Sequence, residues 1–404
     1  MNQNQKLVTL LSLYIAQSIP MSFFSTVVPV IMRMEHYSLT SIGLVQLVKV
    51  PWILKFLWAP MIDRNSISVN HYKRWIIGSE LFYAFIIASI GFLNLQTDFT
   101  TIIVMMVIAF FFSATQDIAT DAFAVRILRV KERGTGNGIQ AAGSFVGALV
   151  GSGVLLALYS HVGWSTLLFI LSGFITVALI PLYLFRYEEH LLPRNSTPAS
   201  MKDVLTFFKL PNMGKRVLLL FLFYAGFIGM MAMIKPFFVD HGLSIEDIAF
   251  ISGIFGTSVG VLSALSAGLI IRKFGSGRAI YFIAFFNIVA TSFFTLISTG
   301  YDARYMFYIG AALLWGSYAM SSALVYTISM ETVRPGREGS DYTIQIIIPH
   351  MSGLLMAVLS GKVANHFGYT TLFLIETSIT VFVFFAIRWL YINNTQEEEE
   401  ETMA

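Results

Sequence analysis

Two acidic residues interrupt a strongly apolar stretch, SATQDIATDAFAVRIL (residues 113–128). Asp117 and Asp121 are four residues apart, so they share one face of a helix. Two carboxylates in a low-dielectric environment repel each other, so at least one is expected to hold a proton near neutrality, which suits proton pickup and release. We therefore interpret Asp117 as a proton-coupling or substrate-binding residue. We expect Asp121 to be mainly a structural partner of Arg126 or Arg64.

Two lysines lie in a second apolar stretch, which includes LKFLWAPMIDR (residues 54–64). A lysine at the centre of a bilayer costs roughly 3 kcal/mol or more. Lys55 is close enough to a span end to extend to the interface, whereas Lys49 is expected to face a wet cavity, an anionic solute or an acidic partner. Because Lys55 and Asp117 lie at similar depths, we hypothesise that they balance each other. Asp63 and Arg64 then form a gate at the mouth of the span.

Other polar side chains inside apolar segments are weaker candidates for proton coupling or substrate binding. His350 is a candidate proton carrier, although a neutral, hydrogen-bonded histidine fits equally well. Gln17 lies near Pro20, which can free a carbonyl group, and Gln140 and Gln345 occupy matching places in two related segments. The sequence has no cysteine and its seven histidines are scattered, so no metal site and no cofactor are expected.

Composition defines the elements that must position these residues. Of 404 residues, 56% are hydrophobic and 12% are charged, whereas about a quarter of a soluble domain is charged. The apolar runs are continuous rather than alternating, which favours membrane-spanning helices over β-strands. We predict an all-α membrane protein with twelve spans, near residues 7–32, 40–59, 75–95, 100–125, 136–160, 164–186, 216–239, 246–271, 279–298, 303–330, 342–364 and 369–391.

The basic residues predict the orientation of these spans. With the N-terminus inside, 20 of the 26 lysines and arginines fall on the cytoplasmic side and three fall outside. This bias predicts a multi-pass membrane protein with both termini in the cytoplasm. A bacterial inner membrane is the location implied by the family resemblance given below. The net charge of +3 is too small to indicate a nucleic-acid partner.

The two halves of the chain look like copies of each other. HVGWSTLLFI (161–170) matches HFGYTTLFLI (366–375), and ERGTGNGIQ (132–140) matches REGSDYTIQ (337–345), both at an offset of 205 residues. Six-span halves related in this way are typical of alternating-access transporters. The predicted divisions are an N-terminal bundle (1–190), a cytoplasmic linker (191–213), a C-terminal bundle (214–393) and an acidic tail (394–404).

These features resemble the major facilitator superfamily over essentially the whole chain. APMIDRNS (59–66) is similar to the loop signature of that superfamily, and GLIIRKFGSGR (268–278) is similar to its second-half echo. LKFLWAPMIDR together with SATQDIATDAFAVRIL resembles the branch of anhydromuropeptide permeases, related siderophore importers and, more distantly, acetyl-CoA transporters. The resemblance implies that Asp63, Arg64, Asp121 and Arg126 are gating or structural charges.

Small residues recur at intervals of four in two predicted spans. Such stripes allow helix backbones to approach closely. By the resemblance, the fifth and eighth spans meet across the two halves, and smooth surfaces there would let the halves rock. The residues assigned to these helix interfaces are Gly143, Gly147, Gly151, Gly256, Gly260 and Gly268.

We interpret the chain as a secondary transporter that imports a small solute with protons by alternating access, acting as a monomer among membrane lipids. A siderophore is the first choice of solute, because muropeptide permeases commonly carry more than twelve spans. A muropeptide is the alternative. Outside the transporter class, a membrane-embedded enzyme or a channel remains open. No clustered acid–base or metal constellation supports the enzyme, and a channel would not need duplicated halves with gating loops.

Overall fold

The computed structural model describes residues 3–36, 45–186, 197–301 and 303–391. These residues are nearly all helical and include no strand, in agreement with the predicted all-α class. The start of the predicted second span (40–44), the first part of the predicted linker (191–196) and the predicted acidic tail (394–404) lie outside the described residues.

The chain divides into two compact units, each of which includes a short segment from the other half of the sequence. Residues 334–343 group with the first unit, and residues 130–142 group with the second. At the repeat offset of 205, residues 130–142 correspond to 335–347, so the two exchanged segments are nearly equivalent. Unit 1 comprises residues 1–129, 143–205 and 334–343, and unit 2 comprises 130–142, 206–333 and 344–404.

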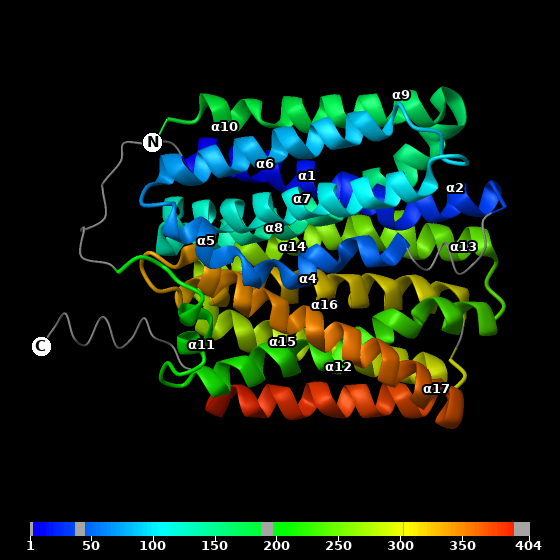
Figure 1. Ribbon diagram of the computed structural model, residues 1–404. Coiled ribbons are helices and arrows are strands. Elements are labelled where there is room, and N and C mark those ends of the chain that lie inside the picture. Colours follow the sequence, from blue (N-terminus) through cyan, green and yellow to red (C-terminus); the bar gives the residue numbers. More distant parts are fainter. Residues whose placement is uncertain (1–2, 37–44, 187–196, 302, 392–404) are drawn as a thin grey trace, which may run out of the picture. The chain divides into compact units, whose positions relative to one another are not determined.

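The helices of unit 1 come mainly from the first half of the chain (Figure 1). Helix α8 (Val130–Leu149) continues from unit 2 into unit 1, and α11 (Lys202–Phe207) spans the boundary between the units. The other elements are α1 (Gln3–Ser22), η1 (Phe23–Val27), α2 (Val28–Met34), η2 (Gln46–Lys49), α4 (Val50–Leu54), η3 (Lys55–Leu57), α5 (Ala59–Arg64), α6 (Val69–Ile90), α7 (Phe99–Ile127), η4 (Val150–Val154), α9 (Leu155–Ala178) and α10 (Ile180–Leu184).

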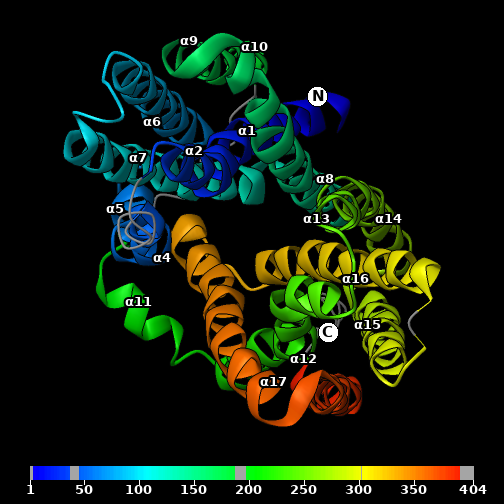
Figure 2. The same ribbon diagram turned by 90° about the vertical axis from the view of Figure 1, so that its right-hand side faces the viewer.

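Unit 2 is built from the helices of the second half. Helix α16 packs against both α14 and α15 and lies between them (Figure 2). Helix α17 begins in unit 1 and continues into unit 2. The elements are α12 (Met213–Asp240), α13 (Ile245–Ala249), η5 (Phe250–Phe255), α14 (Gly256–Phe274), α15 (Ser276–Ser298), α16 (Arg304–Glu331) and α17 (Glu338–Leu390).

Length and composition make these helices suitable for crossing a membrane. Within the described residues, eight helical stretches are long and apolar enough to do so. Two of the eight, 130–184 and 338–390, bend sharply at Gly163 (φ 72°) and Gly368 (φ 79°), which glycine tolerates without a steric cost. The two glycines are 205 residues apart, as the repeat predicts. Allowing for these breaks, for α6 and for the fragmented stretch 46–64, the fold is consistent with twelve spans.

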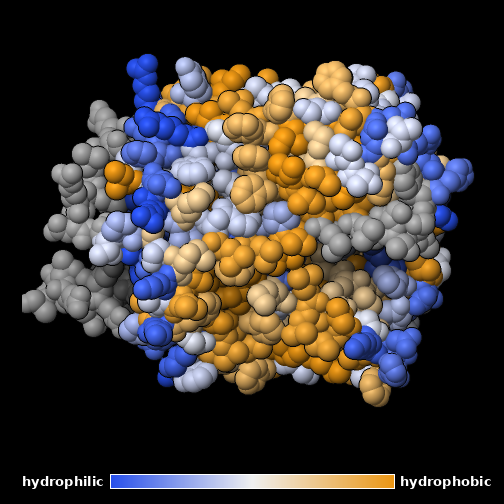
Figure 3. All heavy atoms as spheres, in the orientation of Figure 1, coloured by the Kyte–Doolittle hydropathy of each residue, from blue (hydrophilic) through white to orange (hydrophobic). Residues whose placement is uncertain are grey.

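The face seen in Figure 3 fits a membrane environment. Hydrophobic side chains gather along the middle of the helices, and hydrophilic side chains gather near the helix ends. Many large apolar side chains are exposed on these helices, among them Phe85, Phe285 and Phe385. Exposed apolar surface of this extent is favourable in contact with lipid and unfavourable in contact with water.

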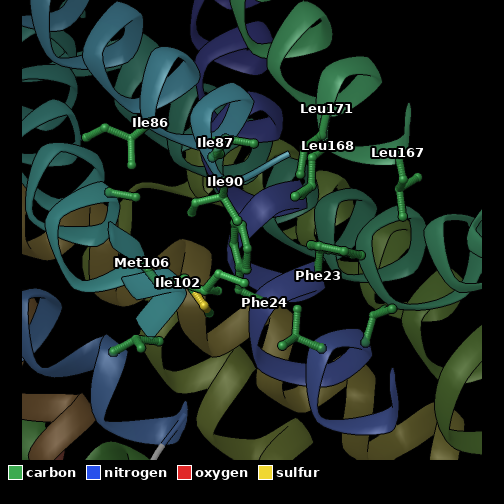
Figure 4. Close-up of a cluster of buried hydrophobic side chains, with 14 of the residues drawn as sticks. Phe23, Phe24, Ile86, Ile87, Ile90, Ile102, Met106, Leu167, Leu168 and Leu171 are labelled. Carbon is green, nitrogen blue, oxygen red and sulfur yellow. The ribbon is translucent and has the colours of Figure 1, made fainter. Parts of the chain in front are cut away.

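Inside unit 1, apolar side chains from several helices form a tightly packed cluster (Figure 4). Phe23 and Phe24 contribute from η1, and their rings meet edge to face with centroids 5.2 Å apart. Ile87 from α6 and Leu168 from α9 are fully buried in the same cluster. This cluster fixes α1, α6, α7 and α9 relative to one another, and these helices position the polar residues described below.

The stretch that carries Lys49 and Lys55 is broken into short helical pieces rather than forming one regular helix. Pro51 opens α4 and Pro60 opens α5, each within the first two helical positions. Proline lacks the N–H group that an interior helical position needs, so regular helix cannot continue through either residue. Between them, Lys55 begins a short 3₁₀ turn and its side chain is buried.

The glycine stripe at 143–151 packs differently from the arrangement expected from the sequence, whereas Gly268 lies against the predicted fifth span. A Cβ atom on Gly143 or Gly147 would meet α1 of the same unit, at Tyr14 and Ser18 respectively, and one on Gly151 would meet Ile19 and Ser22. The close approach between the predicted fifth and eighth spans instead involves Gly138 and Gly268, both in unit 2. Gly256 packs against the Trp315 ring, and Gly260 is buried in α14. The stripe at 143–151 is therefore an interface within one bundle.

We expect Gly147→Leu to abolish uptake and to lower the stability of the purified protein by more than about 1–3 kcal/mol, the usual cost of overpacking a core. A Cβ atom at this position would overlap the Ser18 side chain and lie only 2.9 Å from the Ser18 carbonyl carbon. Gly153→Leu is the matched control, because a Cβ atom there meets nothing within 4 Å. Thermal unfolding and uptake assays on both variants measure the effect. Equal stability of the two variants would contradict the assigned packing.

Candidate functional site

The carboxylate of Asp117 is buried in unit 1 and is held by two side chains from other elements. Lys55 forms an ion pair with Oδ2, and the side-chain amide of Gln17 donates to Oδ1 at 2.6 Å. Asp117 and Lys55 are each 3% exposed and Gln17 is 7% exposed. The structure thus brings together three of the residues that the sequence indicated, from α7, η3 and α1.

Aromatic residues of the broken span keep Lys55 in place. The Trp52 ring lies beneath the ammonium group, with Nζ 4.8 Å from the ring centroid. The Trp58 indole donates to Thr115 Oγ1 at 3.1 Å, which ties the residue after η3 to α7 two residues before Asp117. A cation over an aromatic face is stabilised by the ring quadrupole. The lysine therefore has a fixed position even without its carboxylate partner.

A buried pair of this kind is more sensitive to change than a surface ion pair. Removing one partner leaves an uncompensated charge in a low-dielectric environment, which costs roughly 3–5 kcal/mol. A second ligand or a proton can relieve that cost by replacing the missing partner. The chemistry available to the group of Asp117, Lys55 and Gln17 is therefore an exchange of partners, in which the carboxylate trades Lys55 for a proton.

The remaining predicted polar residues do not join this group. Lys49 is half-buried and makes no hydrogen bond or ion pair with any described residue. His350 is exposed on α17, and one ring nitrogen lies 2.7 Å from the Ile346 carbonyl oxygen. Gln140 is buried in α8. Gln345 is held in unit 2, where it accepts from Arg216 Nε at 2.7 Å and donates to the Ser329 carbonyl at 3.0 Å.

A second polar centre in unit 1 surrounds the carboxylate of Asp63. Oδ1 accepts from Tyr72 Oη and from the Gly339 amide, both at 2.8 Å. Oδ2 accepts from the Ser340 amide at 2.7 Å and from the Ser340 hydroxyl at 2.6 Å. Gly339 and Ser340 lie in the first turn of α17, where backbone N–H groups have no helical acceptor. Asp63 therefore caps this helix, and residues 334–343 are called the docked segment below.

Glu338 adds an ion pair to the docked segment. Its carboxylate lies 2.8 Å from Arg126 Nε, and the Arg126 guanidinium lies over the Tyr72 ring at 5.8 Å. A second pair joins Arg337 Nε to Asp203 at 3.0 Å. Two ion pairs and the cap at Asp63 thus hold the docked segment on unit 1.

Two of the predicted gating residues have other partners than expected. Asp121 was expected to pair with Arg126 or Arg64, but Tyr14 donates to Asp121 Oδ1 at 3.0 Å. Arg126 instead forms an ion pair with Glu338. Arg64 is exposed and contacts no acidic side chain among the described residues. In place of the expected arginine, a tyrosine hydroxyl from a neighbouring helix is one partner of the Asp121 carboxylate.

Sequence reasoning missed four residues of these centres: Tyr14, Tyr72, Glu338 and Ser340. Glu338 had a detectable signal, because it lies in REGSDYTIQ, the repeat partner of ERGTGNGIQ. An acid followed by small residues at the start of an apolar run also indicates a helix N-terminus. The two tyrosines had no comparable signal, since a tyrosine in an apolar helix usually packs as an aromatic ring.

The docked segment is expected to bind more tightly as the pH falls from 7 to 5. Burial raises the pKa of Asp63 to about 6, and its four hydrogen bonds only partly oppose this rise. Because this pKa exceeds that of an undocked aspartate, near 3.8, docking takes up a proton between about pH 4 and pH 6. The equilibrium constant for docking should therefore be about tenfold larger at pH 5 than at pH 7, and it should not change above pH 7.

Cysteine labelling can measure this dependence, because the chain has no native cysteine. Thr343→Cys places a thiol at a fully buried position of the docked segment, and Ile67→Cys provides an exposed reference for the pH dependence of the reagent. The ratio of the two labelling rates should fall between pH 7 and pH 5. An unchanged ratio, or the same fall in a protein that also carries Asp63→Asn, would contradict the assignment.

Apolar helices long enough to span a bilayer, with buried charges paired inside them, are the features of a multi-pass membrane protein. The sequence model described as "Major Facilitator Superfamily" matches residues 10–348. The chain belongs to this family, as the resemblance of its loop motifs had suggested.

Named relatives lie within the branch predicted from the two motifs. The anhydromuropeptide permease of Escherichia coli (strain K12) is 22% identical over 386 residues, covering 94% of this chain and 78% of that protein. A protein of Rickettsia typhi named "Putative transporter AmpG 3" is 26% identical over 409 residues, covering 95% of each chain.

Solved structures support the fold alone. A variant of the Escherichia coli fucose:proton symporter FucP matches with a TM-score of 0.75 at 15% identity, covering 96% of this chain and 98% of that one. A bacterial homologue of the iron transporter ferroportin matches with a TM-score of 0.69 at 12% identity, covering 96% and 98%. Neither identity is high enough to carry a substrate to this chain.

The relatives remove one argument made from length. The alignment covers 78% of the E. coli permease, which is therefore longer than the aligned region. The Rickettsia relative, however, matches this chain over nearly its whole length. A protein named for the AmpG class can therefore have about the length of this sequence, and length no longer favours a siderophore over a muropeptide.

Proposed function

We propose that this chain imports a peptidoglycan fragment of the anhydromuropeptide kind, together with protons, across a bacterial inner membrane. The ion pair between Asp117 and Lys55, closed by Gln17, is the observation that supports proton coupling. The named relatives at full or nearly full coverage support the choice of solute. The siderophore, our first choice from the sequence, has no support of this kind.

In the proposed mechanism, Asp117 exchanges partners during each cycle. While Lys55 is bound, Asp117 is ionised and neither charge is exposed to lipid. The peptide part of a muropeptide carries carboxylates, which compete with Asp117 for Lys55. An aspartate that loses its lysine in a buried position takes up a proton rather than remaining charged. Solute binding and proton uptake are then linked, because the solute takes Lys55 and a proton replaces Lys55 on Asp117.

Lys49 extends this proposal to a second solute contact. It lies in η2, six residues before Lys55, and no described residue neutralises it. A half-buried ammonium group without a carboxylate partner favours an anionic ligand. We assign Lys49 to the solute and Lys55 to the exchange between solute and Asp117.

The docked segment supplies the gate in this account. We place both termini in the cytoplasm, which puts Asp63, Arg126 and Glu338 on the cytoplasmic side. Binding of the docked segment to unit 1 and its release are the two states of this gate. Release breaks the helix cap at Asp63 and the Arg126–Glu338 pair. We further propose that the protein acts as a monomer, because unit 1 contains the complete Asp117 group.

Uptake by purified protein in proteoliposomes tests the substrate assignment. With an imposed pH gradient, acid outside, radiolabelled anhydromuropeptide should accumulate above its external concentration. An excess of unlabelled muropeptide should block this uptake, whereas an iron-loaded siderophore should not. Accumulation of siderophore without accumulation of muropeptide would reverse the assignment. Equilibration of either solute without accumulation would indicate a facilitator rather than a proton symporter.

A further inference from the structure

Unit 2 contains a small pocket that the transport cycle does not use. It lies where the start of α12, the residue after α16 and the end of α17 meet, and its lining includes Arg216, Thr332, Leu390 and Tyr391. Its volume is about 20 Å³, and one oxygen-sized atom needs roughly 10–15 Å³. The pocket therefore accepts one atom of a larger group, and it is too small for a transported solute.

Two residues that line this pocket each have a buried hydrogen-bond donor without a described partner. Arg216 is 8% exposed and its Nε donates to Gln345 Oε1 at 2.7 Å, but its Nη2 has no acceptor among the described residues. The hydroxyl of Thr332 is likewise buried without a partner in the described chain. A buried donor left unpaired costs free energy, and more when it is charged. Both donors favour an acceptor oxygen, and the guanidinium favours an anionic one.

The acid nearest to this site does not supply that oxygen. Glu331 ends α16, and its carboxylate accepts from the Tyr391 hydroxyl at 3.2 Å. No ion pair joins Glu331 to Arg216 among the described residues. The positive charge of Arg216 is thus only partly balanced, through space rather than by direct contact.

The neighbours of the pocket place it at the level of lipid headgroups. Lys215 precedes Arg216, and its ammonium lies 5.0 Å from the centroid of the Trp389 ring. Trp389, next to the pocket residue Leu390, is 61% exposed. Tryptophan and lysine at the ends of apolar helices mark the boundary between hydrocarbon and water. Lys215 adds a second positive charge beside the pocket.

We propose that this pocket binds the phosphate of an anionic phospholipid, with one phosphate oxygen held by Arg216 Nη2 and Thr332 Oγ1. The rest of the headgroup lies outside the pocket near Lys215, and the acyl chains run along the lipid-facing side of α12 and α17. The site is separate from the Asp117 group, which belongs to unit 1. A lipid in this position stabilises the contact between Arg216 and Gln345, because Nε and Nη2 of the guanidinium then both have a hydrogen-bond acceptor.

Native mass spectrometry of the purified protein tests this proposal. The protein is equilibrated with equal amounts of phosphatidylglycerol and phosphatidylcholine that carry the same acyl chains, and the retained lipids are counted. We expect a preference for phosphatidylglycerol that Arg216→Gln lowers about tenfold. Arg278→Gln is the matched control, because Arg278 is exposed on α15 and does not line the pocket. Equal preference in these two variants would overturn the proposal.

A second pair of variants tests the site without changing either Arg216 or Gln345. Thr332→Glu and Thr332→Gln differ in charge but hardly in size, at a partly exposed position of the pocket. The glutamate variant should retain about tenfold less phosphatidylglycerol than the glutamine variant. Equal retention would contradict a phosphate at this site, whether or not Arg216→Gln folds.

Two other sources of an anionic oxygen are outcomes of the same experiment. If free inorganic phosphate stabilises the wild-type protein against heat and phosphatidylglycerol does not, the site binds a soluble anion and the lipid proposal fails. The sequence also carries five glutamates at 397–401. If phosphatidylglycerol binds in an Arg216-dependent way only after residues 396–404 are removed, the glutamates are the natural ligand and the proposal is overturned.

Discussion

Asp117→Asn should abolish proton-driven accumulation of the solute while leaving exchange down a gradient intact. Asparagine keeps the size of the side chain and can still accept from Gln17, but it cannot take up a proton in this range. One proton per solute and a pH difference of two units allow roughly 100-fold accumulation, because each unit is equivalent to 1.36 kcal/mol. In the variant, the ratio of internal to external solute should fall to about one.

The measurement is solute uptake in proteoliposomes with and without the imposed pH gradient. Exchange of external labelled solute for internal unlabelled solute is followed in parallel, to show that the variant still binds and moves its substrate. Asp121→Asn is the matched control, because Asp121 lies one turn away and accepts from Tyr14. If Asp117→Asn still accumulates solute in response to the gradient, Asp117 is not the coupling residue.

Lys55→Ala should be the most destabilising single change among the charged residues of unit 1. It leaves Asp117 buried with only Gln17 as a described hydrogen-bond partner. An uncompensated buried charge costs roughly 3–5 kcal/mol. A proton on Asp117 would relieve only part of that cost, because the side chain would still be buried without its lysine. Combining Lys55→Ala with Asp117→Asn should restore most of the lost stability.

Thermal unfolding of the purified proteins provides the readout. Lys362→Ala serves as the control, because that lysine is exposed. The account requires the double variant to be more stable than Lys55→Ala alone. If the two destabilising effects simply add, Lys55 and Asp117 act independently, and the partner exchange proposed here has no basis.

The Asp117–Lys55 contact shows that the position of a charge along a predicted span can predict its partner. Counting residues from the span ends placed both charges at one level, and a buried charge of either sign needs a partner. The same counting could not find Gln17, because the register of α1 against α7 depends on the packing of Phe23, Phe24 and their neighbours. The broken geometry of residues 46–64 was also missed, although Pro51 and Pro60 are visible in the sequence.

The docked segment makes contacts that could not be predicted from a single sequence. Asp63 was recognised from its place after Pro60. Its backbone hydrogen-bond donors, Gly339 and Ser340, are more than 270 residues away in the sequence. A helix cap between segments this far apart leaves no local signal in a single sequence. A Cβ atom at Gly339 would come within 2.9 Å of Asp63 Oδ1, so the need for glycine at 339 follows from the contact itself.

The glycine stripe at 143–151 was recognised correctly as a site of close helix approach, but its partner was not. A stripe of small residues predicts that some helix lies against it, and it carries no information about which one. Here α1 occupies that face, through Ser18 and Ile19. By contrast, the repeat at offset 205 predicted a structural equivalence that the sharp turns at Gly163 and Gly368 display.

Proton movement driven by the solute is the most direct test of proton-coupled import through Asp117. Proteoliposomes containing a pH-sensitive dye, with no initial gradient, are mixed with anhydromuropeptide on the outside. The account predicts acidification of the interior with the wild-type protein and none with Asp117→Asn, while labelled solute still equilibrates in both. Solute entry through the wild-type protein without acidification would contradict proton-coupled import.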